Sequence, residues 1–324
     1  MKSLALKLVR LGIAMAASCA ALPALAAYPE RPVHIIVSVP AGGSMDAASR
    51  IVGEKLSALW GQTVVVENKP GASGRVATGV VAKSPPDGYT VIALANSAIS
   101  DEVLRPDTQA RPSRDLAPVA RVFSTPAVLL AHKSLGIETL AQYINLARTK
   151  PGTLSFGSSG EGTSTHFFGE LLKHEAGIDI IHVPYAGEGP NLNDLMAGHL
   201  SSSFVSAMGA RKADQSDRVR MLAVATMERS PLLPNVPSFA ELGYRGIDME
   251  SWAGFFVPVG TPPAVIEKIA VDVQKVLAMS DVGERFNAIG LVPAGESPHE
   301  LGRRVESDKA YWTKAIKDTG IKVK

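Results

Sequence analysis

The sequence predicts an α/β protein built from two lobes. Short apolar runs alternate with amphipathic segments of helical period, the pattern of mostly parallel sheets flanked by helices. The chain has 324 residues, 46% of them hydrophobic, which is enough for two separate cores. Two extended runs, at 119–131 and 252–258, interrupt the alternation and predict two crossover segments between the lobes.

Residues 1–26 have the order of a secretory signal peptide. Lys2, Lys7 and Arg10 precede an apolar run at 11–25, and Ala24-Leu25-Ala26 is a small-residue cleavage signal. The run has about 15 residues, fewer than the roughly 20 that span a bilayer. We therefore expect an exported protein cleaved after Ala26, whereas a buried N-terminal helix would leave the three leading cations unexplained.

Cys19, the single cysteine of the chain, lies inside this leader. The preceding Ala16-Ala17-Ser18 could make it a poor lipoprotein cleavage site, an alternative disfavoured by the short apolar run before it. The mature chain then has no disulfide and no cysteine nucleophile. Removing the three leader cations from 33 leaves 30 against 31 acids, a formal charge of −1. This balance gives no reason to invoke nucleic acid or an anionic membrane.

The expected elements follow from apolar periodicity and from turn residues between the runs. Strands are expected at 33–39, 63–67, 89–95, 153–157, 179–183, 200–205, 220–226 and 252–258. Helices are expected at 45–60, 74–83, 139–149, 164–176 and 190–197, with two more opening at 261–263 and 297–300 and an irregular loop at 101–118. Thr261 is predicted to cap the first of these two, and Ser297 with Glu300 forms a capping box for the second, which runs to about Asp318.

The two crossovers divide the chain into a discontinuous lobe 1, residues 27–128 plus 250–324, and a continuous lobe 2, residues 129–249. In open α/β sheets, ligands bind outside the carboxyl ends of the strands. A ligand is therefore expected between the lobes.

The first candidate ligand loop is Pro40-Ala41-Gly42-Gly43-Ser44, between a strand and a helix. Paired glycines let the backbone approach a ligand closely, and the amides and positive end of the helix favour an anion. Ser44 can cap the helix, and Asp46 complements its dipole. An ordinary strand-to-helix turn explains the local pattern equally well.

The second loop, 156–166, has the same placement in the other lobe and favours the ligand interpretation. It contains several glycines and hydroxyl side chains, which offer neutral donors to a carboxylate. Glu161 would repel an anion unless it faced solvent or met a cationic group. We favour a structural role for His166, at the start of the following helix.

Enzyme motifs are absent from these loops. The segment starting at Gly157 fails the nucleophile-elbow pattern because Glu161 stands where the last glycine belongs, and the dinucleotide and phosphate-loop patterns are missing. Five histidines, His132, His166, His174, His182 and His199, show no paired metal-ligand spacing. We therefore expect no catalytic residue, no metal and no cofactor. The alternative is a periplasmic enzyme acting on a small organic acid through Ser159 and His166.

Several segments, in this order, resemble the Bug-type receptors of tripartite tricarboxylate transporters. The matching segments are Tyr28-Pro29-Glu30-Arg31-Pro32-Val33, Val39 to Asp46, Val66-Glu67-Asn68-Lys69-Pro70-Gly71-Ala72-Ser73-Gly74, Pro86-Asp87-Gly88-Tyr89-Thr90, Arg114 to Val119, Ser158 to His166, Val183-Pro184-Tyr185, Arg229-Ser230-Pro231 and Pro234-Asn235-Val236-Pro237. The resemblance covers nearly all of the mature chain.

The resemblance implies a periplasmic-binding-protein (Venus flytrap) fold whose two lobes close around a small carboxylate. It implies a periplasmic, non-catalytic receptor that delivers its ligand to the membrane permease subunits of such a transporter and works as a monomer. A sensor that presents its ligand-bound form to a membrane kinase could use the same fold and stays open. The ligand-binding residues that it implies are Ala41, Gly42, Gly43, Ser44, Ser159, Gly160, Thr163 and Ser164. Asp46 and Tyr185 also match family positions and are expected to shape the pocket.

One departure from the family concerns ligand choice. Many members have a Phe-Asp pair facing the cleft, whereas this chain has Phe204-Val205. Val205 then replaces a carboxylate, which disfavours an amino acid ligand and favours a mono- or dicarboxylate with apolar or aromatic character.

Overall fold

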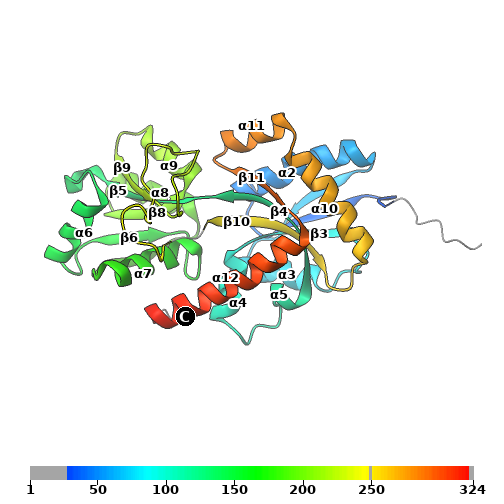
Figure 1. Ribbon diagram of the computed structural model, residues 1–324, viewed down its shortest axis with the longest axis horizontal. Helices are drawn as coiled ribbons and strands as arrows, with labels where there is room; N and C mark the ends of the chain where they lie inside the picture. Colours follow the sequence, from blue (N-terminus) through cyan, green and yellow to red (C-terminus); the bar gives the residue numbers. More distant parts are fainter. Residues whose placement is uncertain (1–27, 248–249, 321–324) are drawn as a thin grey trace, which may run out of the picture.

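The computed structural model describes residues 28–247 and 250–320, so the predicted signal peptide and Cys19 lie outside the described residues. The described chain forms two sheets, each covered by helices on both faces, and the α/β class is confirmed. Figure 1 shows the two lobes side by side, joined by the long strands β4 (Leu116–Thr125) and β10 (Ser251–Pro258).

The first sheet has the strand order β11-β4-β10-β3-β1-β2. Its other strands are β1 (Val33–Val37), β2 (Val64–Asn68), β3 (Thr90–Ala95) and β11 (Val292–Glu296). One face packs against α2 (Ser44–Trp60), α10 (Pro263–Leu277) and α11 (Ser280–Ala288). The other carries η1 (Ala72–Gly74), α3 (Arg75–Val81), α4 (Ser97–Leu104), α5 (Pro112–Asp115) and α12 (Pro298–Thr319). Ile35 of β1 is buried in the core on the face covered by α2, α10 and α11, whereas Ile36 is buried in the core on the opposite face. Successive side chains of a strand point to opposite faces of its sheet, which explains this difference.

The second sheet has the order β7-β6-β8-β5-β9. Its strands are β5 (Ala127–His132), β6 (Ser155–Ser158), β7 (Ile181–Pro184), β8 (Ser202–Ser206) and β9 (Val219–Val224). The short η2 (Lys133–Leu135) follows β5, and α6 (Leu140–Thr149) and α7 (Ser164–Ala176) cover one face. The opposite face packs against α8 (Glu188–Ala197) and α9 (Ala207–Asp214). Leu129 of β5 is buried in the core beneath α6 and α7, and Val128 is buried in the core beneath α8 and α9.

Strand directions are more mixed than the sequence pattern predicts. β1 pairs in parallel with β2 and β3, and β6 pairs in parallel with β7 and β8. The pairings made by β4, β5 and β10 are antiparallel. β5 and β10 each enter a sheet from the other lobe and therefore run against the βα units already in it, a direction that single-strand hydrophobicity does not encode.

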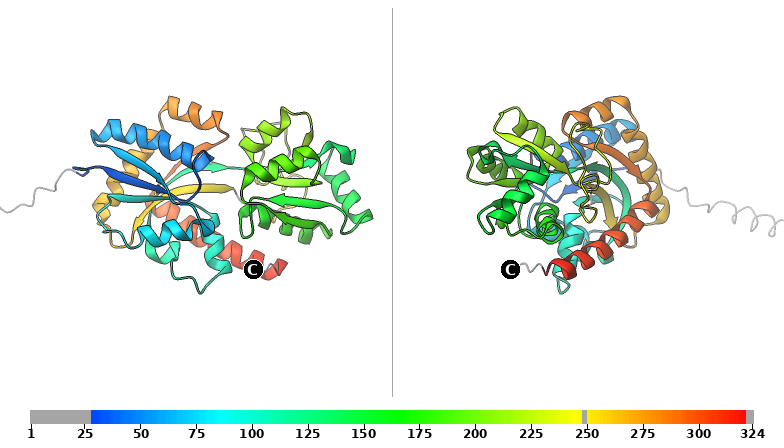
Figure 2. Two further views of the ribbon diagram at one scale, coloured as in Figure 1. Left: turned by 180° about the vertical axis from the view of Figure 1, so that it is seen from behind. Right: turned by 60° about the vertical axis from the view of Figure 1, so that its left-hand side comes forward.

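The chain changes sheets at Pro126, between β4 and β5. The proposed boundary after residue 128 would fall inside β5, and the proposed boundary at 249/250 touches residues outside the described part. A third link joins the lobes: the end of α12 reaches lobe 2, where Trp312 is buried in the core with its ring centroid 4.4 Å from that of Phe167. Figure 2 shows α12 passing from beneath the first lobe to the second.

Helix starts follow local sequence closely where a capping box is present. Ser297 and Glu300 form the predicted box of α12, and Thr139 forms one with Gln142 at α6. Two predicted caps are wrong. Gly43, not Ser44, is the N-cap of α2, and the hydroxyl of Thr261 donates to Pro258 O while Pro262 precedes α10.

The loop predicted at 101–118 contains structure. Its first part completes α4, and α5 and the start of β4 follow within the same stretch. Asp101 and Glu102, which gave this stretch its polar appearance, are buried and paired, Asp101 with Arg75 and Arg105 and Glu102 with Ser113.

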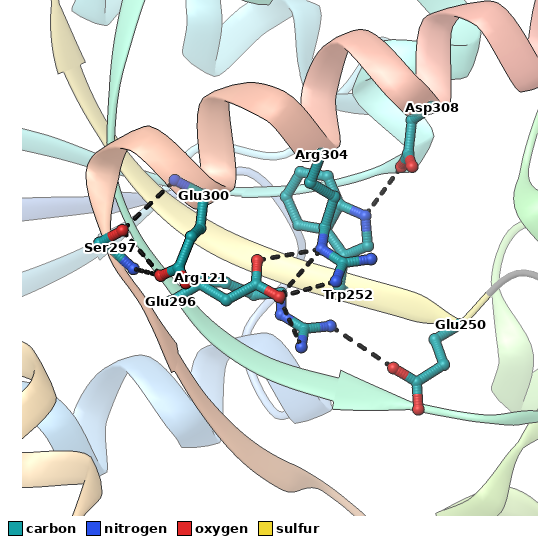
Figure 3. A network of polar contacts seen from close by, with 8 residues as sticks. All are labelled: Arg121, Glu250, Trp252, Glu296, Ser297, Glu300, Arg304 and Asp308. Carbon is teal, nitrogen blue, oxygen red and sulfur yellow. Dashed lines mark hydrogen bonds and ion pairs between the residues drawn. The ribbon is translucent and has the colours of Figure 1, made fainter.

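A polar network ties the crossovers of lobe 1 to α12 (Figure 3). Arg121 of β4 lies between Glu296 at 2.9 Å and Glu250 at 3.4 Å, and Arg304 of α12 also pairs with Glu296 at 2.7 Å. Beside them, Trp252 Nε1 donates to Asp308 Oδ2 at 2.8 Å. Burial raises the pKa of Asp308 to about 6, although the bond from Trp252 and the nearby arginines oppose the shift.

Asp308 should make stability depend on pH in a defined direction. An unfolded aspartate titrates near pH 4, so between about pH 4 and 6 the folded chain binds the extra proton and the contribution of Asp308 to stability falls as pH rises. Asp308→Asn keeps an acceptor for Trp252 and cannot ionise. Relative to the unmodified chain, we expect the variant to gain on the order of 1–3 kcal/mol between pH 4 and 7. Urea unfolding at both pH values measures this, and a pH-independent difference would contradict it.

Candidate functional site

A cavity of about 690 Å³ lies between the two sheets and is lined by both lobes. Lobe 1 contributes segments 38–40, 70–74 and 95–97, and lobe 2 contributes Ser159, segments 163–165 and 186–188, Val205 and Ser206. Thr125, Pro126, Ala127 and Ser251 of the crossovers complete the wall. The site therefore lies at the carboxyl ends of β1, β3, β6 and β8, at the junction of the lobes.

The first loop reaches this cavity through its N-terminal part. Ser38, Val39 and Pro40 line the wall, whereas Ala41, Gly42, Gly43 and Ser44 are not among the lining residues. Ala41 and Gly42 are exposed, and Gly43 and Ser44 are half-buried.

Asp46 is the residue that shapes the first loop. It is buried, accepts hydrogen bonds from Gly42 N at 2.9 Å and Asn68 Nδ2 at 3.0 Å, and pairs with Arg50 at 2.9 Å. Burial alone would raise the pKa of Asp46, but the bonds from Arg50, Gly42 and Asn68 outweigh it and lower the pKa. Asp46 does not line the cavity and acts by fixing the backbone at Gly42.

The second loop brings Ser159, Thr163 and Ser164 to the cavity wall. The Thr163 hydroxyl donates to Gly160 O at 2.7 Å, and Ser159 N donates to Thr165 Oγ1 at 3.0 Å, so much of the hydroxyl content holds the loop itself. Gly160 is left out of the wall but has φ +132°, and a Cβ there would meet Tyr185 O at 3.2 Å. Glu161 is exposed and outside the wall, which removes its repulsion of an anion.

His166 has a structural role beneath this loop. Its Nδ1 accepts from Gly162 N at 3.2 Å, and its ring stacks on His182 with centroids 3.9 Å apart. Burial lowers the pKa of His166 to about 4 and that of His182 to about 3. Both rings are therefore neutral near pH 7, and the candidate anion site gains no imidazolium from them.

The serine–histidine pair at the start of the second loop, Ser158 with His182, is unsuited to nucleophilic catalysis. Ser158 Oγ lies 2.7 Å from His182 Nε2, but Ser158 is buried and does not line the cavity. With its pKa lowered to about 3, His182 is a weak base. In the predicted alternative pair, Ser159 with His166, one ring nitrogen of His166, Nδ1, is already engaged by Gly162 N.

A third loop, at 70–74, lines the cavity, and our prediction of ligand residues missed it. Ala72 and Ser73 have φ values of +48° and +52°, between Gly71 at +139° and Gly74 at +93°. Left-handed backbone costs a non-glycine residue about 1–2 kcal/mol, and such strain is concentrated at functional sites. In the sequence, the motif Asn-Lys-Pro-Gly-Ala-Ser-Gly at 68–74 could have indicated that this loop lines the ligand site.

Asn96 and Ser164 connect the two lobes at the cavity. Ser164 Oγ donates to Asn96 Oδ1 at 3.4 Å, and both residues are buried. Close by, Ser100 of α4 donates to Gly162 O at 3.0 Å. The second loop is therefore held directly against lobe 1.

The remaining predicted site residues differ in placement. Val205 is buried and lines the cavity. Tyr185 does not line it, and its hydroxyl donates to Asp194 at 2.7 Å, while burial followed by that bond raises the pKa of Tyr185 to about 12. Glu188, which the sequence analysis did not single out, lines the cavity close to Val205 in the wall.

Two further properties bear on the function class. Across residues 28–247 and 250–320, no group of three or more His, Cys, Asp or Glu side chains is arranged to hold a metal ion. Among the helices of the described residues, none combines the length and apolar character needed to cross a membrane.

Comparison with known proteins places this geometry in a family. Residues 48–321 match the model of the tripartite tricarboxylate transporter family receptor, and the chain belongs to this family. It is 36% identical over 310 residues to a UPF0065 protein in the tcbD-tcbE intergenic region of Pseudomonas sp. strain P51, covering 95% of this chain and 92% of the relative. It is 32% identical to Protein BugT of Bordetella pertussis, covering 97% of each.

Solved structures of proteins related to this family are similar to the chain over most of its length. Rpa4515 of R. palustris with adipate has a TM-score of 0.84 at 33% identity, covering 91% of this chain and 99% of that one. MatC from Rhodopseudomonas palustris with bound malate has a TM-score of 0.79 at 29% identity, covering 89% and 100%. The two-lobed periplasmic-binding-protein fold is confirmed by these neighbours.

The bonds of Asp46 give a stability prediction. Asp46→Asn removes the charge that holds Arg50 and Gly42, so we expect a loss of about 1–3 kcal/mol in unfolding free energy. Glu54→Gln on the same helix, where Glu54 makes an exposed pair with Arg285, should leave the unfolding free energy nearly unchanged. Urea denaturation compares them, and equal losses would show that Asp46 does not brace the loop.

Proposed function

We propose that this chain is a periplasmic receptor that captures a small carboxylate between its lobes and delivers it to the permease of a tripartite tricarboxylate transporter. The observation that carries the proposal is the shared cavity, walled by loop residues from both lobes at the carboxyl ends of parallel strands. Membership of the receptor family supports it, as do the similar structures of Rpa4515 with adipate and of MatC with bound malate. The predicted signal peptide supports the periplasmic location.

The carboxylate would be bound without a cationic partner. The first amides of a helix have no acceptor within the helix and attract negative charge, and α7 begins at the second loop in this way. Ser159, Thr163 and Ser164 offer hydroxyls or amides from lobe 2, and segments 38–40 and 70–74 offer backbone from lobe 1. Ala41, Gly42, Gly43, Ser44 and Gly160 remain proposed ligand residues, which closure of the lobes would have to bring to the wall.

Uncharged hydrogen-bond donors are suited to a receptor that must both bind its ligand and release it. Several short hydrogen bonds to a charged group give useful affinity, and release needs no ion pair to be broken. Membership of a receptor family supports the proposal of binding without turnover.

Removal of one donor tests the carboxylate site. Ser159→Ala should weaken binding of a captured carboxylate about tenfold, because one hydrogen bond to a charged group is lost. Ser280→Ala, at an exposed position at the start of α11, is the matched control and should bind as the unmodified chain does. Titration calorimetry over straight-chain C2–C8 mono- and dicarboxylates measures both. If none of these acids bound at millimolar concentration, the proposal would be wrong.

Hinge closure is the second testable part. In the described part of the chain, β4–β5 and β10 are the strands that connect the two sheets, and the buried end of α12 limits the rotation that they permit. We expect saturating carboxylate to reduce the radius of gyration in small-angle scattering, with no change for a carboxylate that does not bind. A bound ligand that left the scattering curve unaltered would argue against closure.

A further inference from the structure

Among the described residues that line the cavity, Glu188 is the only charged one. It is the first residue of α8 and is half-buried. The rest of the wall formed by residues 28–247 and 250–320 is apolar, amide or hydroxyl in character, with no Lys, Arg or His in it. A carboxylate entering this cavity therefore meets a fixed acid.

The Glu188 carboxylate is held in place by lobe 2. Oε2 accepts from Ser206 N, and Oε1 accepts from Ser206 Oγ at 2.8 Å. Ser206 is the N-cap of α9, so the acid lies at the positive end of that helix. At Gly209 an added Cβ would come within 2.5 Å of Glu188 Oε1, so glycine there leaves room for the carboxylate. Charge-assisted bonds of this kind oppose displacement of Glu188 by a ligand carboxylate.

The charge of Glu188 acts on the whole cavity. In a space of about 690 Å³, a second ligand carboxylate would lie within roughly 10 Å of it, about one Debye length even in 0.1 M salt. Repulsion between two such charges at a protein surface corresponds to roughly a tenfold or greater loss of affinity. Ala186 and Val205 also line the cavity and contribute apolar groups to its wall, and Val205 directly precedes Ser206, which holds the Glu188 carboxylate.

We propose that Glu188 restricts the receptor to ligands with one carboxylate, whose far end is uncharged and can donate a hydrogen bond to Glu188 while its apolar part lies against Val205. This selectivity rests on the proposed carboxylate-receptor function and narrows its ligand class. The residue that discriminates between ligand charges is then Glu188 of α8. Val205, where this chain lacks the carboxylate of the family's Phe-Asp pair, contributes an apolar contact instead.

A matched ligand pair tests the inference. Calorimetry compares adipate with 6-hydroxyhexanoate, which have the same chain length and differ in the group at one end. The unmodified chain should bind 6-hydroxyhexanoate at least tenfold more tightly than adipate. Glu188→Gln keeps the acceptor oxygen, removes the charge, and should reduce this ratio about tenfold. Glu228→Gln, at an exposed position of lobe 2, should leave the ratio unchanged.

The outcomes separate the two proposals. If the unmodified chain bound adipate as tightly as, or more tightly than, 6-hydroxyhexanoate, the selectivity inference would be overturned while the receptor function stood, and this result needs no variant to fold. An unchanged ratio in a folded Glu188→Gln variant would also overturn it. If neither these acids nor any C2–C8 carboxylate bound, the receptor function itself would fail.

Discussion

The constraint on which the proposed function depends is that an anion must be bound in a cavity whose wall, as far as the structure describes it, contains no cation. Backbone amides and hydroxyls must then converge from several directions, because each contributes only part of the stabilisation that one arginine would supply. The two-sheet architecture meets this need. The crossovers β4–β5 and β10 place the carboxyl ends of β1 and β6 at one junction, where their loops face a shared space.

Rigidity of these loops is achieved by groups that do not touch the cavity. Asp46 fixes the first loop through Gly42, and the stacked pair His166 and His182 supports the second through Gly162 and Ser158. The lowered pKa of each histidine follows from burial and keeps the pair neutral. Because the supporting groups are already bonded to the loops, the proposed ligand capture would need little reorganisation within each loop.

The sequence predicted what depends on neighbours along the chain. The capping box of Ser297 and Glu300, the strand-to-helix glycine loops and the α/β alternation are local patterns, and the structure contains each of them. The end of α12 could not be predicted in the same way, because Trp312 is apolar on any interpretation and only the fold shows that it enters the lobe 2 core. α4 was missed because its buried acids, paired with residues outside the helix, resembled a polar loop.

The candidate site shows the same division. Ser159, Thr163, Ser164 and Val205 were predicted from their motifs and line the cavity. The position of the Glu188 carboxylate depends instead on Ser206, 18 residues away on another element.

The most direct measurement of the proposed binding site is a crystal structure with a bound carboxylate. The account predicts carboxylate oxygens within hydrogen-bond distance of lobe 1 backbone in 38–44 or 70–74 and of lobe 2 donors in 159–165. A ligand held by one lobe alone, or outside this cavity, would contradict it.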